Sequence, residues 1–381
     1  MQLNCSRLRL AAVALAAASL LGACSSPGPR DPIELAPFVK TVDTERVWTV
    51  DLGANETGLL MPVVTETGVY AAGADGLFRI EAQTGRVLWK VKPAARVSAG
   101  VGSDGHIVAV GTNTGFLVVY DETGRELWTT KLSGDMITPP LVGSGLVIVR
   151  TSDTRISCYD ALSGERRWRY QAHAPALSLR VAREMRFSPA GVLIGQTNGK
   201  LLALDSAGSP VFEIPVAEPK GTTEVDRLVD VVGAPLVDAS LMCASAYQGN
   251  VLCLSAQNGR QIWSRPIDAV SGPVSDGSRI YVTASDGSIH AFDHDSGTPL
   301  WVSKEFLWRT PSAVSVLPNA IAVGDFDGVV SVLDPETGKT IGRAEISGAV
   351  KSAPVPMAGG ALFQTDEGRL VFVKAAKVGK E

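Results

Sequence analysis

Histidine and acidic residues are the first candidates for metal chemistry in this 381-residue chain. His290 and His294 are four residues apart, but they lie in or beside a predicted strand, where that spacing separates them by roughly 13 Å. The segment DFDG at 325–328 superficially resembles a calcium loop, yet no later acidic residue has the spacing of an EF-hand. We therefore predict solvated histidines, a hairpin turn at 325–328 and no metal site.

Catalytic signatures are also missing from the sequence. It contains neither a phosphate-binding GxxxxGK[ST] motif nor a GxSxG nucleophile elbow. Once residues 1–23 are removed, 33 basic residues face 39 acidic ones, a formal charge of about −6 that argues against nonspecific nucleic-acid binding. We predict that the protein is not an enzyme.

Residues 1–23 have the features of a secretory signal that ends at a cysteine. Arg7 and Arg9 precede an apolar stretch, 10–21, that is too short to span a bilayer as a helix. The sequence LLGAC then places small residues before Cys24, as a lipoprotein signal peptidase requires. We predict that Cys24 is acylated; the alternative is an ordinary signal peptide with an incidental cysteine.

The segment after Cys24 indicates where the lipid would reside. Ser25 stands where aspartate commonly retains Gram-negative lipoproteins in the inner membrane, so the outer membrane is the predicted location. Residues 24–43 are rich in proline and small polar residues and are predicted to form a flexible, lipidated tether. No other segment approaches 18 uninterrupted apolar residues, so no transmembrane helix is expected.

Three cysteines remain once Cys5 leaves with the signal and Cys24 is acylated: Cys158, Cys243 and Cys253. The compartment permits disulfides, and Cys243 and Cys253 flank a turn symmetrically, so they could face each other across a hairpin. Cross-strand disulfides need a specific geometry. Small buried strand residues are therefore the favoured interpretation.

A repeat of about 40 residues dominates the rest of the chain. Seven copies place a glycine four residues before an aromatic slot, with spacings of 38 to 51 residues between the glycines at positions 85, 124, 164, 208, 259, 297 and 338. Each copy combines alternating apolar residues with DG, TG or NG turns, which is typical of a four-stranded β-propeller blade. The longest spacing results from an insertion at 216–235, which we place in a loop. In repeat folds, such insertions often lie on the binding face.

Tryptophan fills most of the aromatic slots. We predict that the rings are structural pegs against neighbouring blades rather than ligand-binding groups: Trp48, Trp89, Trp128, Trp168, Trp263 and Trp301. Phe212 and Gly342 occupy the slots of the fourth and seventh copies, where the packing should be weaker.

The two chain ends complete each other. The eighth copy ends after its third strand, at 368–374, whereas residues 46–52, centred on Trp48, form a fourth strand that no repeat precedes. Pairing these segments would close the ring and remove exposed strand edges. We predict an all-β, eight-bladed propeller of antiparallel blades over residues 44–376.

The repeat motif Ala-x-Asp-x-x-Thr-Gly-x-x-x-Trp resembles the tryptophan-docking repeat of quinoprotein dehydrogenases. Those enzymes carry adjacent cysteines and bind calcium and pyrroloquinoline quinone (PQQ), but this sequence has no adjacent cysteines. We expect no cofactor. A PQQ-dependent periplasmic dehydrogenase and a glycan-binding propeller remain the alternative functions.

The lipoprotein signal, the eight blades and the stretch TTEVDRLVDV together resemble the BamB family of the outer-membrane β-barrel assembly machinery. The resemblance implies a non-catalytic scaffold on the periplasmic face of the outer membrane. It also implies binding to the POTRA domains of BamA; direct contact with unfolded barrel clients is an open hypothesis.

The same resemblance implies specific partner-binding residues. The family's Leu-x-Leu-Arg motif matches Leu177, Leu179 and Arg180, and a second segment assigns a role to Asp230, while Val232 replaces a family acid. Exposed leucines beside an arginine would combine an apolar anchor with a forked hydrogen-bond donor, a mixture that suits a binding hot spot. From the residues alone, period-two leucines also fit the inward positions of an inner strand.

Overall fold

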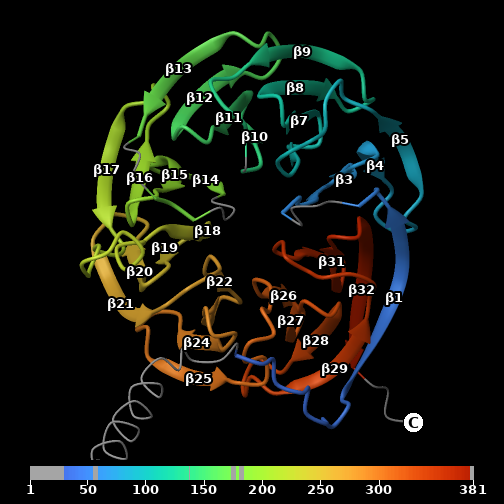
Figure 1. Cartoon of the computed structure of the whole chain (residues 1–381), viewed down its shortest axis with the longest axis vertical. Helices are drawn as coiled ribbons and strands as arrows, with labels where there is room; N and C mark the ends of the chain where they lie inside the picture. The colour runs from blue at the N-terminus through green and yellow to red at the C-terminus, as the bar shows by residue number, and fades with distance from the viewer. Residues whose placement is uncertain (1–29, 55–58, 137, 173–176, 180–183, 378–381) are drawn as a thin grey trace, which may run out of the picture.

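The repeats form a ring of eight blades in a computed structural model that describes residues 30–54, 59–136, 138–172, 177–179 and 184–377 (Figure 1). Each blade is a four-stranded antiparallel sheet. Blades one to four consist of β2 (Val63–Thr65), β3 (Gly68–Gly73), β4 (Gly76–Ile80), β5 (Val87–Val91); β6 (Gly102–Ser103), β7 (Ile107–Gly111), β8 (Phe116–Asp121), β9 (Glu126–Lys131); β10 (Leu141–Gly143), β11 (Leu146–Arg150), β12 (Arg155–Asp160), β13 (Arg166–Gln171); β14 (Met185–Ser188), β15 (Gly191–Gly195), β16 (Lys200–Leu204) and β17 (Pro210–Pro215).

Blades five to eight continue the ring and confirm the predicted fold. They consist of β18 (Val231–Val237), β19 (Leu241–Ala246), β20 (Gly249–Ser255), β21 (Gln261–Ile267); β22 (Val274–Ser275), β23 (Arg279–Thr283), β24 (Ile289–Asp293), β25 (Pro299–Ser303); β26 (Ser315–Leu317), β27 (Ala320–Gly324), β28 (Val329–Leu333), β29 (Thr340–Glu345); and β30 (Val355–Met357), β31 (Gly360–Gln364), β32 (Arg369–Lys377) with β1 (Val42–Asp51). In the part of the chain that the structure describes, no helix is long and apolar enough to cross a membrane.

Burial follows the position of a strand within its blade. The second strands are buried on both faces, as in β3 and β27, because neighbouring blades cover each side. The outermost strands, such as β13, alternate between exposed and half-buried positions. The hydrophobic core is therefore a series of layers between adjacent blades, which explains why the middle strands read as continuous apolar segments.

The chain ends close the ring as predicted. β1 pairs antiparallel with β32, and Trp48 stands opposite Phe372 (Figure 1, blue beside red). The strand begins at Val42, four residues before the predicted start, because Val42 packs into the core layer between blades seven and eight. Strand exchange between the two ends thus completes the eighth blade.

The six tryptophan rings pack between blades, and each rests on a glycine of the next blade. A side chain added at Gly85, Gly164 or Gly297 would lie within 3 Å of the ring of Trp48, Trp128 or Trp263, respectively. Five of the six indole N–H groups donate to a backbone carbonyl of the next blade at 2.9–3.0 Å, namely those of Trp48, Trp89, Trp128, Trp263 and Trp301. The positive φ of this position explains why glycine recurs in each repeat, and ring packing adds a second reason wherever a tryptophan precedes it.

The two slots without tryptophan differ from the others in the predicted direction. In the blade that follows Phe212, the glycine that a peg would contact is Gly259. A Cβ added at Gly259 would meet no atom within 4 Å, so the ring–glycine contact made by the tryptophans is missing there. At Gly342, a Cβ would lie 2.9 Å from the carbonyl oxygen of Val42. The slot of the seventh blade has no side chain because the N-terminal segment of the chain passes over this position.

Substituting Gly297 with alanine should destabilise the protein more than the same change at Gly259. The two glycines have φ values of +65° and +68°, so both variants carry the strain of a left-handed alanine, about 1–2 kcal/mol. Only Gly297→Ala must also displace a ring, that of Trp263, at a further cost of about 1–3 kcal/mol. Urea unfolding of both variants measures the difference; equal losses would mean that the rings do not constrain these glycines.

The structure corrects the interpretation of the cysteines. Cys243 and Cys253 stand directly opposite each other on β19 and β20 and form a disulfide. Cys158 is a buried free cysteine. The favoured interpretation of unbonded residues was wrong because the register of the hairpin, which the sequence alone left open, places the two side chains face to face.

The predicted turn at 325–328 is confirmed. The carboxylate of Asp325 accepts the backbone N–H groups of Asp327 and Val329 at 3.0 and 2.9 Å, which closes the hairpin between β27 and β28. Asp325 is therefore a turn-capping residue.

Candidate partner-binding face and central channel

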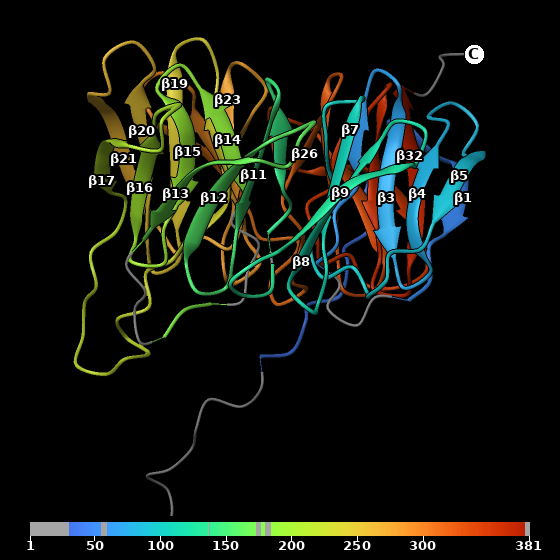
Figure 2. The same ribbon diagram turned by 90° about the horizontal axis from the view of Figure 1, so that it is seen from above.

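The connections between successive blades all emerge at one end of the ring, together with the turns between second and third strands. Residues 216–230, 304–314 and 346–354 belong to this end, which we call the loop face. Figure 2 shows the long connection between β17 and β18 projecting from it. The insertion predicted at 216–235 accordingly enlarges a loop on this face, although its last five residues belong to β18.

The structure brings together two of the segments predicted to bind a partner. The backbone N–H of Leu179 donates a hydrogen bond to a carboxylate oxygen of Asp230, a residue 51 positions away. Both positions precede the innermost strands of neighbouring blades, β14 and β18. One rigid contact therefore fixes the leucine segment to the base of the inserted loop.

The leucines are not part of an inner strand. Leu177 is 47% exposed and Leu179 is half-buried, and β14 begins only at Met185. Arg180, the third residue of the predicted motif, lies outside the described residues. The exposure of Leu177 supports the interface interpretation over the core interpretation.

Asp230 has a different position from the one expected of a contact residue. Its side chain is fully buried, and its backbone carbonyl accepts the N–H of Tyr247 at 2.9 Å. It acts by holding Leu179 rather than by presenting a charge to solvent. Val232 is buried in the layer that contains Trp263, so a carboxylate at this position would face the core.

Further apolar side chains are exposed on the loop face. Val225 in the inserted loop is 61% exposed, and Val270 and Phe326 are also exposed. The loop around Val225 is ordered by a reciprocal pair of hydrogen bonds between Thr223 and Asp226, at 3.2 and 3.1 Å. Asp226 thus stabilises a turn in this loop.

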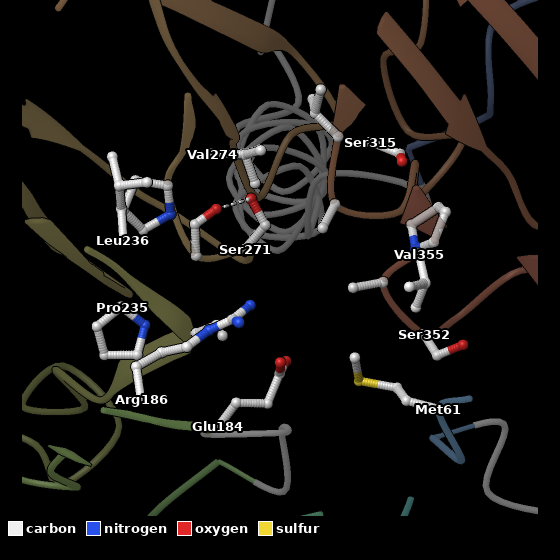
Figure 3. A pocket seen from close by; sticks show the side chains of 18 of the residues that line it. Met61, Glu184, Arg186, Pro235, Leu236, Ser271, Val274, Ser315, Ser352 and Val355 are labelled. Atoms are coloured by element: carbon white, nitrogen blue, oxygen red, sulfur yellow. Dashed lines mark hydrogen bonds between the residues drawn. The ribbon is translucent and has the colours of Figure 1, made fainter. Parts of the chain in front are cut away.

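A central channel of about 600 Å³ lies between the innermost strands and was not predicted from the sequence (Figure 3). Its wall is largely apolar, with Met61, Leu236 and Val355 among the lining residues, and it carries Glu184 and Arg186. Because the inner strands have only two to seven residues, their alternation is too short to indicate which side chains face the axis.

The channel holds little that could perform chemistry. Burial raises the pKa of the Glu184 carboxyl above its usual range, and nearby Arg186 opposes that rise. Among the residues that the structure describes, no three His, Cys, Asp or Glu side chains are grouped so as to hold a metal ion. Among the described lining residues, the charged side chains are one acid, Glu184, and two bases, Arg186 and Lys351.

The prediction of solvated histidines is wrong for His294. This residue is 6% exposed, its Nε2 lies 2.9 Å from Asp238 Oδ2, and its Nδ1 lies 2.7 Å from Asp295 Oδ1. Burial by itself would lower the pKa of His294, but the two carboxylates outweigh it and raise the pKa above 6.5. Asp238 comes from the neighbouring blade, so this contact links blades five and six.

Stability should fall at alkaline pH because of His294. The pKa of His294 is raised in the folded state. Its contribution to the free energy of unfolding is therefore complete below the unfolded-state pKa of about 6.5, and it is lost as the pH rises through the folded-state pKa. His294→Gln should remove this dependence and cost about 2 kcal/mol below that range, through loss of charge-assisted hydrogen bonds. Thermal unfolding between about pH 5.5 and 9 measures it, with the exposed His106→Gln as control; an unchanged profile in His294→Gln would contradict the assignment.

Comparison with known proteins indicates a single family. The family model described as "Outer membrane protein assembly factor BamB" matches residues 77–303. Proteins of that name from Bordetella pertussis and Burkholderia pseudomallei are each 38% identical, the first over 96% of both chains and the second over 93% of this chain and 94% of its own.

Solved structures give a consistent result. The crystal structure of BamB from Moraxella catarrhalis superposes with a TM-score of 0.80 at 26% identity, over 87% of this chain and 99% of the other. A quinohemoprotein alcohol dehydrogenase from Comamonas testosteroni has a TM-score of 0.66 at 15% identity, over 89% of this chain and 78% of the other. The second likeness shows a common fold alone.

Proposed function

The chain belongs to the family of the outer membrane protein assembly factor BamB, and we propose that it acts as a non-catalytic scaffold that binds the POTRA domains of BamA through its loop face. In this function the protein assists the assembly and insertion of β-barrel proteins into the outer membrane. It needs no cofactor, and acylation of Cys24 anchors it to the periplasmic face of that membrane.

One observation carries the proposal: the hydrogen bond between Leu179 and Asp230. It fixes the segment that carries the exposed Leu177 to the base of the inserted loop, so two segments from neighbouring blades are held together on the loop face. A preorganised surface loses little conformational entropy on binding. Apolar anchors of this type, flanked by Arg180, suit a protein partner better than a small substrate.

Replacing the leucine segment should weaken binding to the POTRA domains at least tenfold, a loss of about 1.4 kcal/mol. The test uses the mature chain with Cys24→Ala, which removes the lipid, and the POTRA domains of BamA from the same species. Calorimetry compares the parent with a Leu177→Ala, Leu179→Ala, Arg180→Ala triple variant. Asp230→Asn should weaken binding in the same direction, because it alters the acceptor that holds Leu179.

A matched control is available at the other end of the ring. Leu162 is 74% exposed in the turn between β12 and β13, which lies on the end opposite to the loop face. Leu162→Ala should bind as the parent does. If the triple variant binds equally well, the interface lies elsewhere; if the parent does not bind, the scaffold function itself is overturned.

A further inference from the structure

Residues 30–41, which the sequence assigned to the flexible tether, lie against blades six and seven in the structure, and we call them the strap. At its start, the N–H of Ile33 donates to the carbonyl of Leu307 at 3.2 Å, and Arg309 Nη1 donates to the carbonyl of Ile33 at 3.2 Å. The guanidinium of Arg30 lies 4.2 Å from the ring centroid of Trp308. The strap is thus held by backbone and side-chain contacts from its first described residue.

The strap continues along the outer edge of blade seven (Figure 1, the blue segment beside β29). Leu35 packs against the core layer that contains Tyr281. Arg343 donates to the carbonyl of Ala36 at 3.3 Å and lies 4.8 Å from the ring centroid of Phe38. Ile33, Leu35 and Phe38 are half-buried along the strap, whereas Val39 is exposed, and polar contacts fix the strap backbone.

The surface that receives the strap is itself specialised. Arg309 is held by Asp325 and Asp327 while it binds the strap carbonyl. Gly342 occupies the slot in which other blades carry an aromatic ring, and a side chain there would collide with the backbone at Val42. The seventh blade therefore departs from the repeat where the strap passes into β1.

The strap starts on the loop face. Leu307 and Arg309 belong to the connection between β25 and β26, one of the inter-blade connections that define this face. Figure 2 shows the chain before β1 leaving the ring on the same side as the long connection between β17 and β18. The described start of the strap and the proposed partner-binding segments therefore lie on one side of the propeller.

We infer that the docked strap orients the propeller, turning its loop face toward the membrane. The inference rests on the proposed acylation of Cys24. Six residue steps separate Cys24 from Arg30, a span of at most about 20–22 Å. The eight residue steps from Lys339 to Ser347 run from one face of blade seven to the other. This distance is roughly 26 Å at the rise per residue of a β-strand. The far face therefore cannot turn toward the bilayer while the strap is docked.

An undocked strap would abolish this preference. All residues from Cys24 to Val42 would then be free, giving a tether that spans about 60 Å when extended. Such a tether would allow either face to approach the membrane. The contacts of the strap thus decide the orientation, and the lipid supplies only the attachment.

Fluorescence quenching in vesicles tests the orientation. The full acylated protein is reconstituted in phosphatidylethanolamine and phosphatidylglycerol vesicles that contain a headgroup-attached nitroxide quencher. A fluorophore is attached at Ser347→Cys on the loop face or at Lys339→Cys on the far face, both exposed and at opposite ends of β29. Quenching at 347 should exceed that at 339 at least twofold. Native Cys158 is buried, and burial raises its pKa to about 11, which limits background labelling.

Two variants separate the strap from the anchor. An Arg30→Ser, Ile33→Asp, Leu35→Asp variant should release the strap and bring the two quenching values together. Insertion of about twelve Gly and Ser residues between 29 and 30 should do the same with the strap contacts intact, because it lengthens the free tether. Both should still bind the POTRA domains, since Leu177 and Asp230 are unchanged.

Equal quenching at both positions of the acylated parent would overturn the inference. So would a loop-face preference that persists in both variants. If mass spectrometry finds no lipid on Cys24, the anchor and the orientation are both wrong. Binding to the POTRA domains, measured separately, then shows whether the scaffold function survives without them.

Discussion

Replacing Arg309 with methionine is expected to lower the free energy of unfolding by about 3–5 kcal/mol, because it leaves a buried carboxylate without its partner. The side chains of Arg309 and Asp325 are only 8% and 1% exposed. Arg309 Nε and Nη2 lie 2.8 and 2.7 Å from Asp325 Oδ2, and Nη2 lies 2.7 Å from Asp327 Oδ2. Methionine keeps much of the aliphatic volume, so the loss reports the charge rather than a cavity.

Urea unfolding monitored by circular dichroism measures this effect, and a surface ion pair gives the control. Arg167 pairs with Asp160 at 2.6 Å, but its side chain is 53% exposed. Arg167→Met should cost no more than about 1 kcal/mol, as is usual for solvent-exposed pairs. If both substitutions cost the same, the Arg309 cluster is not a buried determinant of stability.

Replacing Trp48 with alanine is expected to cost about 3–5 kcal/mol, as large-to-small changes of buried aromatic residues do. The ring is buried between the first and last blades, 5.7 Å from the ring of Phe372, and its Nε1 donates to the carbonyl of Ala82 at 2.9 Å. Trp48 also lies on the strand that closes the ring. Its loss should therefore expose the edge of β32 and promote self-association.

Phe212→Ala is the matched control because Phe212 occupies the equivalent slot of blade four. It is half-buried, and the glycine beyond it makes no close contact. Its replacement should cost less and leave the protein monomeric in analytical ultracentrifugation. Trp48→Phe should retain most of the packing and lose only the hydrogen bond, about 1 kcal/mol. A Trp48→Ala protein as stable as Phe212→Ala would show that ring closure does not depend on this peg.

Features that depend on short-range patterns were predictable from sequence. Alternating apolar residues and turn glycines identify the blades because strand pairing within a hairpin is local. The position of Trp48, ahead of any complete repeat, predicted ring closure because the eighth copy lacked only that strand. The exposure of Leu177 was proposed from a family resemblance, and its residues alone left two interpretations.

Features that depend on contacts between distant residues required the tertiary structure. His294 is buried because Asp238 arrives from another blade, and Asp230 is buried because it holds Leu179. The channel lining follows from the way short inner strands converge on one axis.

The sequence by itself determined the number, order and closure of the blades, since these follow from a repeat whose spacing and turn chemistry are local. Only the tertiary structure decided the partners of the buried charges, the pairing of Cys243 with Cys253 and the docking of residues 30–41. The physical reason is that a repeat fixes which face of a strand is apolar. Strand register and the packing of blades around the ring then decide which distant side chain contacts that face.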